Sequence, residues 1–172
     1  MMSTSKTPEP WLRGTLTEVP AVQRSVLHAL ELAEEDVRRW CAGLSIEEIN
    51  FHPHGLPSVA FHLRHIAGSI DRLLTYAECG DLTQQQLDAL EAEQTPVTSV
   101  AVLIGEIADV VRSASARIRC LSPNDFEQSR SVGRSKLPAS MGGLLVHIAD
   151  HTQRHVGQAV TTAKLIIARR KP

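Results

Sequence analysis

The chain has 172 residues, of which 42% are hydrophobic and 22% are charged, and this composition excludes a mainly disordered or collagen-like protein. Lys and Arg together number 18 against 19 Asp and Glu, so no excess of positive charge is present to bind nucleic acid. No apolar run approaches the roughly 18 residues of a membrane-spanning helix, so we expect no membrane partner either.

Two features of the sequence predict a cytoplasmic protein. The start of the chain lacks the basic segment and apolar run of a signal peptide. The three cysteines are odd in number and include no CxxC pair, which argues against a disulfide framework and favours a reducing compartment.

Prolines divide the chain into blocks that can each contain a helix. Four long stretches contain no proline, namely 21–52, 58–95, 97–122 and 139–171. Apolar residues recur in them at steps of three and four, the period of an amphipathic helix. We predict a first helix that ends near Gly43, a second from about 57 to 79 with Gly80 as its stop, a third that ends before Pro123, and a last one capped by Ser140.

Two shorter segments complete the chain in sequence order. Thr83 can cap a short surface helix that continues through Leu87 and Leu90. Residues 122–138 lack a helical period and contain Pro, Gly, Asn and Asp, so we predict a long irregular loop with a short hairpin around Gly133.

These elements predict an all-α fold, a four-helix bundle with a long irregular loop before the last helix. We expect residues 1–18 to form a flexible N-terminal segment and residues 19–169 to form a single four-helix-bundle domain. The connections 44–56 and 80–95 are long enough for a crossover, so an up-down-up-down arrangement is not required.

Five of the eight histidines fall in two clusters, on the second and last predicted helices. His147, His151 and His155 succeed each other at steps of four, which places neighbouring imidazoles on one helix face. At roughly 100° per residue the three drift by about 80° in all, so they cannot all bind one ion equally well. His62 and His65 lie one turn apart beside the apolar stripe of the second helix, so one helix can complete the ligand set of the other.

The other histidines, His28, His52 and His54, are predicted to lie on the surface or in loops. Spacing alone leaves alternatives to a catalytic metal site. One is a non-catalytic helical-bundle module, stabilised by a metal, that serves a stress response. Another is a haem between the helices with histidines as axial ligands.

The segments FHLRHIAGSIDRLLTY and HIADHTQRHVGQ resemble the DinB/YfiT-like superfamily, and the resemblance extends from about Val19 to Leu165. It implies an unusual four-helix bundle whose metal is bound by one histidine of the second helix and an HxxxH pair of the fourth. By position, the implied ligands are His65, which precedes Ile-Ala-Gly-Ser, together with His151 and His155.

Four further residues are candidates for contact with these ligands rather than with the metal. His62 and His147 become neighbours of the site once the ligands are chosen. Gln158 lies near His147 on the helical wheel, and Asp71 is a carboxylate close to His65 in sequence.

The resemblance implies a divalent metal ion, with Zn²⁺ expected first and Ni²⁺ or Fe²⁺ as alternatives. It also implies a small-molecule substrate. Related bundles include transferases and isomerases that use a low-molecular-weight thiol, so we expect activation of a thiol or of water for transfer or hydrolysis. We further expect a homodimer. No residue of the chain matches the substrate-binding part of those enzymes.

Overall fold

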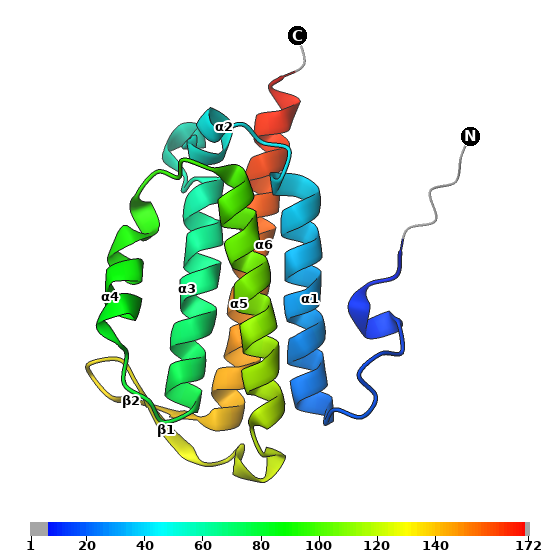
Figure 1. The fold of residues 1–172 in the computed structure, drawn as a ribbon, viewed down its shortest axis with the longest axis vertical. Coiled ribbons are helices and arrows are strands. Elements are labelled where there is room, and N and C mark those ends of the chain that lie inside the picture. The colour runs from blue at the N-terminus through cyan, green and yellow to red at the C-terminus, as the bar shows by residue number, and fades with distance from the viewer. Residues whose placement is uncertain (1–6, 171–172) are drawn as a thin grey trace.

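The computed structural model describes residues 7–170 and confirms a helical bundle (Figure 1). Four long helices form it: α1 (Ala21–Cys41), α3 (Val59–Ala77), α5 (Val100–Cys120) and α6 (Met141–Ala168). The shorter elements are α2 (Ile46–Asn50), α4 (Gln84–Glu91), strands β1 (Ser129–Val132) and β2 (Leu137–Ser140), and single 3-10 turns at Pro10–Leu12, Pro53–Gly55, Ala92–Gln94 and Pro123–Asp125. Among the helices of this described part, none is both long and apolar enough to cross a lipid bilayer.

The connection between α3 and α5 determines the topology of the bundle. Helices α1 and α6 run in one direction, whereas α3 and α5 both run in the opposite one (Figure 1). This is possible because the chain returns alongside α3 through α4 before α5 begins. Helices α1 and α3 each pack against both α5 and α6. One of the two connections that were long enough for a crossover therefore brings the chain back to the end where α3 starts.

Polar residues cap the start of several helices, including the predicted caps Thr83 and Ser140. The Ser58 hydroxyl accepts a hydrogen bond from the third backbone N–H of α3, and Ser140 does the same for α6. Thr83 forms a reciprocal capping box with Gln86, which confirms the short surface helix α4. Each cap binds a backbone donor that has no partner within its own helix.

The end of α3 differs from the prediction by two residues. The helix stops at Ala77, and it is Cys79, with φ of +62°, that adopts the left-handed conformation expected of Gly80. Gly80 is required for another reason, because a Cβ there would lie 2.9 Å from the Thr75 methyl group. The glycine therefore permits a close approach of the chain to the last turn of α3.

The core is filled by aliphatic residues from all four long helices. Leu30, Leu63, Ile107 and Ile148 are each at most 1% exposed and belong to one continuous cluster. Gln23 is a polar exception. Its side-chain amide is buried and donates to the carbonyls of Ile118 and Leu121, at the end of α5.

Part of the N-terminal segment packs against α1. Residues 1–6 lie outside the described part of the chain, and the 3-10 turn Pro10–Leu12 contacts α1. Arg13 donates to the carboxylates of Glu31 and Glu35. The hydroxyl of Thr15 lies 3.2 Å from Nε2 of His28. The prediction that His28 lies at the surface is therefore wrong, because this segment covers it and leaves it 7% exposed.

The loop before α6 contains the predicted hairpin. Strands β1 and β2 pair antiparallel from Ser129 opposite Ser140 to Val132 opposite Leu137. Gly133 turns the chain with φ of +70°. Arg130 anchors the hairpin to the bundle because its Nε donates to the carbonyl of Ala77 at 2.6 Å. The loop thus delivers the chain to the start of α6.

Candidate metal centre

Three imidazoles from two adjacent antiparallel helices meet at one point. His65 lies in the second turn of α3, and His151 and His155 lie one turn apart on α6. One ligand nitrogen from each residue lies within 4.8 Å of the others, and Nε2 of His65 is 2.8 Å from Nε2 of His151. Two nitrogens on one tetrahedral zinc ion lie ~3.3 Å apart, as calculated from Zn–N bonds of about 2.0–2.1 Å. The observed separations, from 2.8 Å to at most 4.8 Å, bracket this value, so the donor set fits a divalent ion.

Glu93 orients His65. It belongs to the 3-10 turn Ala92–Gln94, and its Oε2 lies 2.8 Å from Nδ1 of His65. An ionised carboxylate only accepts hydrogen bonds, so Nδ1 of His65 is the donor. In the neutral ring the lone pair is then on Nε2, the atom that faces His151. Arg72 in turn donates to Oε1 of Glu93 at 2.8 Å.

His62 is a fourth imidazole at the site but is not part of the converging triad. It is 4% exposed, and its Nδ1 lies 3.1 Å from Nδ1 of His155. One of these two nitrogens donates to the other, so His62 orients His155 much as Glu93 orients His65. Phe61 stacks on the ring of His65 with 5.6 Å between centroids and covers one of its faces.

The surroundings favour neutral imidazoles. Burial, together with the neighbouring His155 and His65, lowers the pKa of His151 from 6.5 to about 4. Burial lowers the pKa of His62 to about 4 as well, and it also lowers the pKa of His155. Burial alone would raise the pKa of Glu93, but hydrogen bonds from His65 and Arg72 outweigh it and lower this pKa. Near neutral pH His151 and His155 are therefore neutral, and each ring has one nitrogen with a lone pair that can bind a metal.

The sequence model of the DinB superfamily matches residues 29–159. The chain belongs to the DinB superfamily. No curated protein matches the chain.

Two solved structures resemble this DinB-superfamily protein in fold. A conserved protein from Enterococcus faecalis is 21% identical with a TM-score of 0.71, over 86% of this chain and 98% of that one. YfiT from Bacillus subtilis is 10% identical with a TM-score of 0.66, over 84% of this chain and 87% of that one. YfiT is described as a probable metal-dependent hydrolase with an unusual four-helix bundle topology. At these identities the likeness establishes the fold alone.

The other predicted neighbours of the ligands are not all placed at the site. His147 is exposed, although its ring centroid lies 5.2 Å from that of His151. Gln158 shares this exposed side of α6 and makes no hydrogen bond to a ligand within residues 7–170. Asp71 is directed away, because it accepts hydrogen bonds from Arg117 and Gln86 instead. The carboxylate at His65 is that of Glu93.

The sequence reasoning missed Glu93 and Arg72. Glu93 is 28 residues from His65 and lies in the connection between helices, where no periodic spacing relates it to the histidines. Arg72 is an arginine of α3 that the structure buries, at 8% exposed. The sequence feature that pointed to this segment was the length of the connection 80–95, which Glu93 belongs to.

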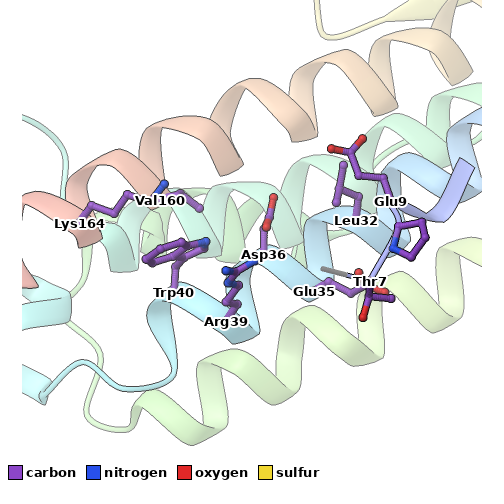
Figure 2. A pocket seen from close by; sticks show the side chains of 10 residues that line it. Thr7, Glu9, Leu32, Glu35, Asp36, Arg39, Trp40, Val160 and Lys164 are labelled. Atoms are coloured by element: carbon purple, nitrogen blue, oxygen red, sulfur yellow. The ribbon is translucent and has the colours of Figure 1, made fainter. Parts of the chain in front are cut away.

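A separate cavity of about 780 Å³ lies between α1, α6 and the N-terminal segment (Figure 2). Trp40 forms its aromatic wall, and the ammonium of Lys164 lies 4.2 Å from the Trp40 ring centroid. Asp36 and Arg39 also point toward this space. No histidine lines it, so this cavity is not part of the metal centre.

Proposed function

We propose that this DinB-superfamily protein is a divalent-metal-dependent enzyme. In this proposal His65, His151 and His155 bind the ion, and the reaction is the hydrolysis of a small molecule or the transfer of a group to a low-molecular-weight thiol. The observation that supports it best is the convergence of the three ligand nitrogens within 4.8 Å. The description of YfiT as a probable metal-dependent hydrolase also supports it.

The donor set determines the chemistry that such an ion would supply. A divalent ion bound by neutral imidazoles retains its full charge and is a Lewis acid that favours the deprotonated form of water or of a thiol. With three protein ligands, a position remains for water or substrate. The residues around the ligands keep the imidazoles oriented: Glu93 accepts a hydrogen bond from Nδ1 of His65, and His62 contacts His155.

The expected Zn²⁺, with Ni²⁺ or Fe²⁺ as alternatives, is part of this proposal, and so are the thiol, the homodimer and the cytoplasmic location. These parts rest on composition and on the family resemblance. The facing nitrogens argue against the haem alternative, since a separation of 2.8 Å between Nε2 of His65 and Nε2 of His151 leaves no space for a porphyrin between the two rings.

The experiment is an activity screen on tag-free protein that is first freed of metal and then reloaded with Zn²⁺, Ni²⁺ or Fe²⁺. Hydrolysis is measured with p-nitrophenyl acetate, and transfer is measured with 1-chloro-2,4-dinitrobenzene and cysteine, glutathione or coenzyme A. We expect turnover that requires the metal and is lost in the His151→Ala variant. The His147→Ala variant is the matched control and should keep its activity.

A specific result would favour the non-catalytic function instead. If the protein binds metal, melts at a lower temperature after chelation, and yet turns over none of these substrates faster than the metal ion alone, the metal only stabilises the bundle. That outcome contradicts the proposed enzyme.

A further inference from the structure

The connection between α3 and α5 does more than return the chain to the start of α5. Residues 83–95, called here the α4 segment, comprise the Thr83 cap, α4 and the 3-10 turn Ala92–Gln94. The α4 segment lies along the outer side of α3 (Figure 1). Its side chains are mostly exposed, and Glu93 is the exception at 6% exposed. A single acidic residue is therefore buried at the point where this segment meets the metal centre.

Two arginines of α3 attach the α4 segment. Nη1 of Arg64 donates to the carbonyl oxygens of Ala92 at 2.8 Å and of Thr95 at 2.6 Å, on either side of Glu93. Nη2 of Arg72 donates to Oε1 of Glu93 at 2.8 Å. The backbone around Glu93 and its carboxylate are thus both fixed from α3, and Oε2 remains directed at Nδ1 of His65.

Gly68 provides the space for this arrangement. A Cβ at position 68 would lie 2.5 Å from Nη1 of Arg72 and 3.1 Å from Oε1 of Glu93. Any larger residue would displace the guanidinium or the carboxylate. At Gly68 no side chain covers the backbone of α3, so the ion pair of Arg72 and Glu93 can pack directly against it.

Stability of the fold does not account for a buried ion pair at this place. The cost of removing two charges from water is often as large as the attraction between them, so apolar residues of similar volume would stabilise this contact as well. Apolar residues, however, cannot accept a hydrogen bond from Nδ1 of His65. The hydrogen bond to that imidazole is therefore the contact for which a carboxylate is needed.

We propose that Glu93 is a positioning residue for His65, and that docking of the α4 segment on α3 is therefore linked to metal binding. This inference rests on the proposed metal site. Glu93 fixes the ring and makes Nε2 of His65 a better ligand, which favours the metal-bound state. Linkage is reciprocal, so a bound metal must stabilise the docked α4 segment by the same factor.

The first test compares zinc affinities, measured by competition with a chelator of known affinity. Loss of an orienting partner typically weakens metal binding on the order of 10–100-fold, and we expect this for Glu93→Ala. Glu93→Gln retains one acceptor oxygen, so its loss should be smaller. Glu91→Ala is the matched control, an exposed glutamate two residues away in the same segment, and it should bind zinc as the original chain does.

The second test measures hydrogen exchange of the backbone amides of residues 84–95 with and without zinc. We expect zinc to slow exchange in this segment, and we expect the slowing to be lost in Glu93→Ala. The core of α5 serves as the internal reference. Arg64→Ala removes two bonds of the α4 segment without removing the carboxylate, so we expect it to weaken zinc binding as well.

The outcomes separate this inference from the proposed metal site. If the original chain binds zinc while Glu93→Ala and Glu93→Gln bind it equally tightly, or if zinc leaves exchange in residues 84–95 unchanged, the inference is overturned and the metal site remains. If the original chain binds no zinc, both fail. Should Glu93→Ala not fold, Glu93→Gln and Arg64→Ala provide the same comparison.

Discussion

Nε2 of His65 on α3 faces Nε2 of His151 on α6 at 2.8 Å. Since Glu93 requires the proton of His65 to be on Nδ1, Nε2 of His65 is an acceptor, and in the metal-free protein Nε2 of His151 donates to it. His155 lies beside both, with its ring centroid 4.4 Å from that of His65 and 4.6 Å from that of His151. The hydrogen bond between His65 and His151 thus lies where a bound cation would contact all three imidazoles.

The metal-free protein should lose stability in mild acid. The pKa of His62 falls from 6.5 in the unfolded chain to about 4 in the folded protein, mainly because of burial. Between these pH values the unfolded chain binds more protons than the folded protein does. The contribution of the neutral, buried His62 to the free energy of unfolding is therefore complete above about pH 6.5 and decreases toward pH 4. His62→Gln should reduce this dependence. The measurement is urea unfolding at pH 7 and pH 5.

A control for this comparison is His54→Asn, which removes an exposed histidine with a φ of 52° that asparagine tolerates. It should leave the pH dependence unchanged. An equal loss of stability between pH 7 and pH 5 in the original chain and in His62→Gln would show that His62 is not responsible.

The three thiols should differ in reactivity. Burial raises the pKa of Cys41 to about 12, so it has almost no thiolate at neutral pH. Cys79 and Cys120 are exposed. With 5,5′-dithiobis(2-nitrobenzoate), these two thiols should react in the folded protein and Cys41 only after denaturation. Three thiols that react at similar rates in the folded protein would argue against the packing of α1.

Gln23→Leu should destabilise the fold by about 1–3 kcal/mol, because two carbonyl groups at the end of α5 lose their donor. Gln158→Leu changes an exposed glutamine in the same way chemically and should alter the free energy of unfolding by no more than about 0.5 kcal/mol. Chemical denaturation of both metal-free variants checks this. A similar effect of the two substitutions would contradict the inter-helix contact of Gln23.

Leu30→Ala should cost about 2–5 kcal/mol, because Leu30 is fully buried and its truncation leaves a cavity in the centre of the bundle. Leu165, at 50% exposed, provides the matched control, and Leu165→Ala should cost less than about 0.5 kcal/mol. The same denaturation experiment measures both. Equal costs would mean that the core is not packed around α1.

Local features of the fold could be predicted from the sequence. The helices follow from apolar periodicity and proline positions, and the caps at Thr83 and Ser140 follow from residue type. The common direction of α3 and α5 could not be predicted, because the length of a connection permits a crossover without requiring one. The burial of His28 was missed for a similar reason, since it depends on where the N-terminal segment packs.

The candidate site, too, could be predicted from the sequence only in part. The pair His151 and His155 is visible as a spacing of four residues on one helix, and His65 was added by resemblance to the family. Glu93 belongs to a segment whose path across α3 depends on Arg64, Arg72 and Gly68, so no short-range pattern identifies it. Asp71 was the wrong carboxylate because, six residues after His65, it faces Arg117 rather than the ligands.

The most direct test is a zinc titration of the metal-free chain and of four histidine variants, followed by calorimetry. We predict saturable binding of about one ion per chain, its loss in His65→Ala, His151→Ala and His155→Ala, and its retention in His147→Ala, whose side chain is exposed outside the triad. Absence of saturable binding in the original chain, or unchanged binding in His65→Ala, would contradict a metal centre shared by α3 and α6.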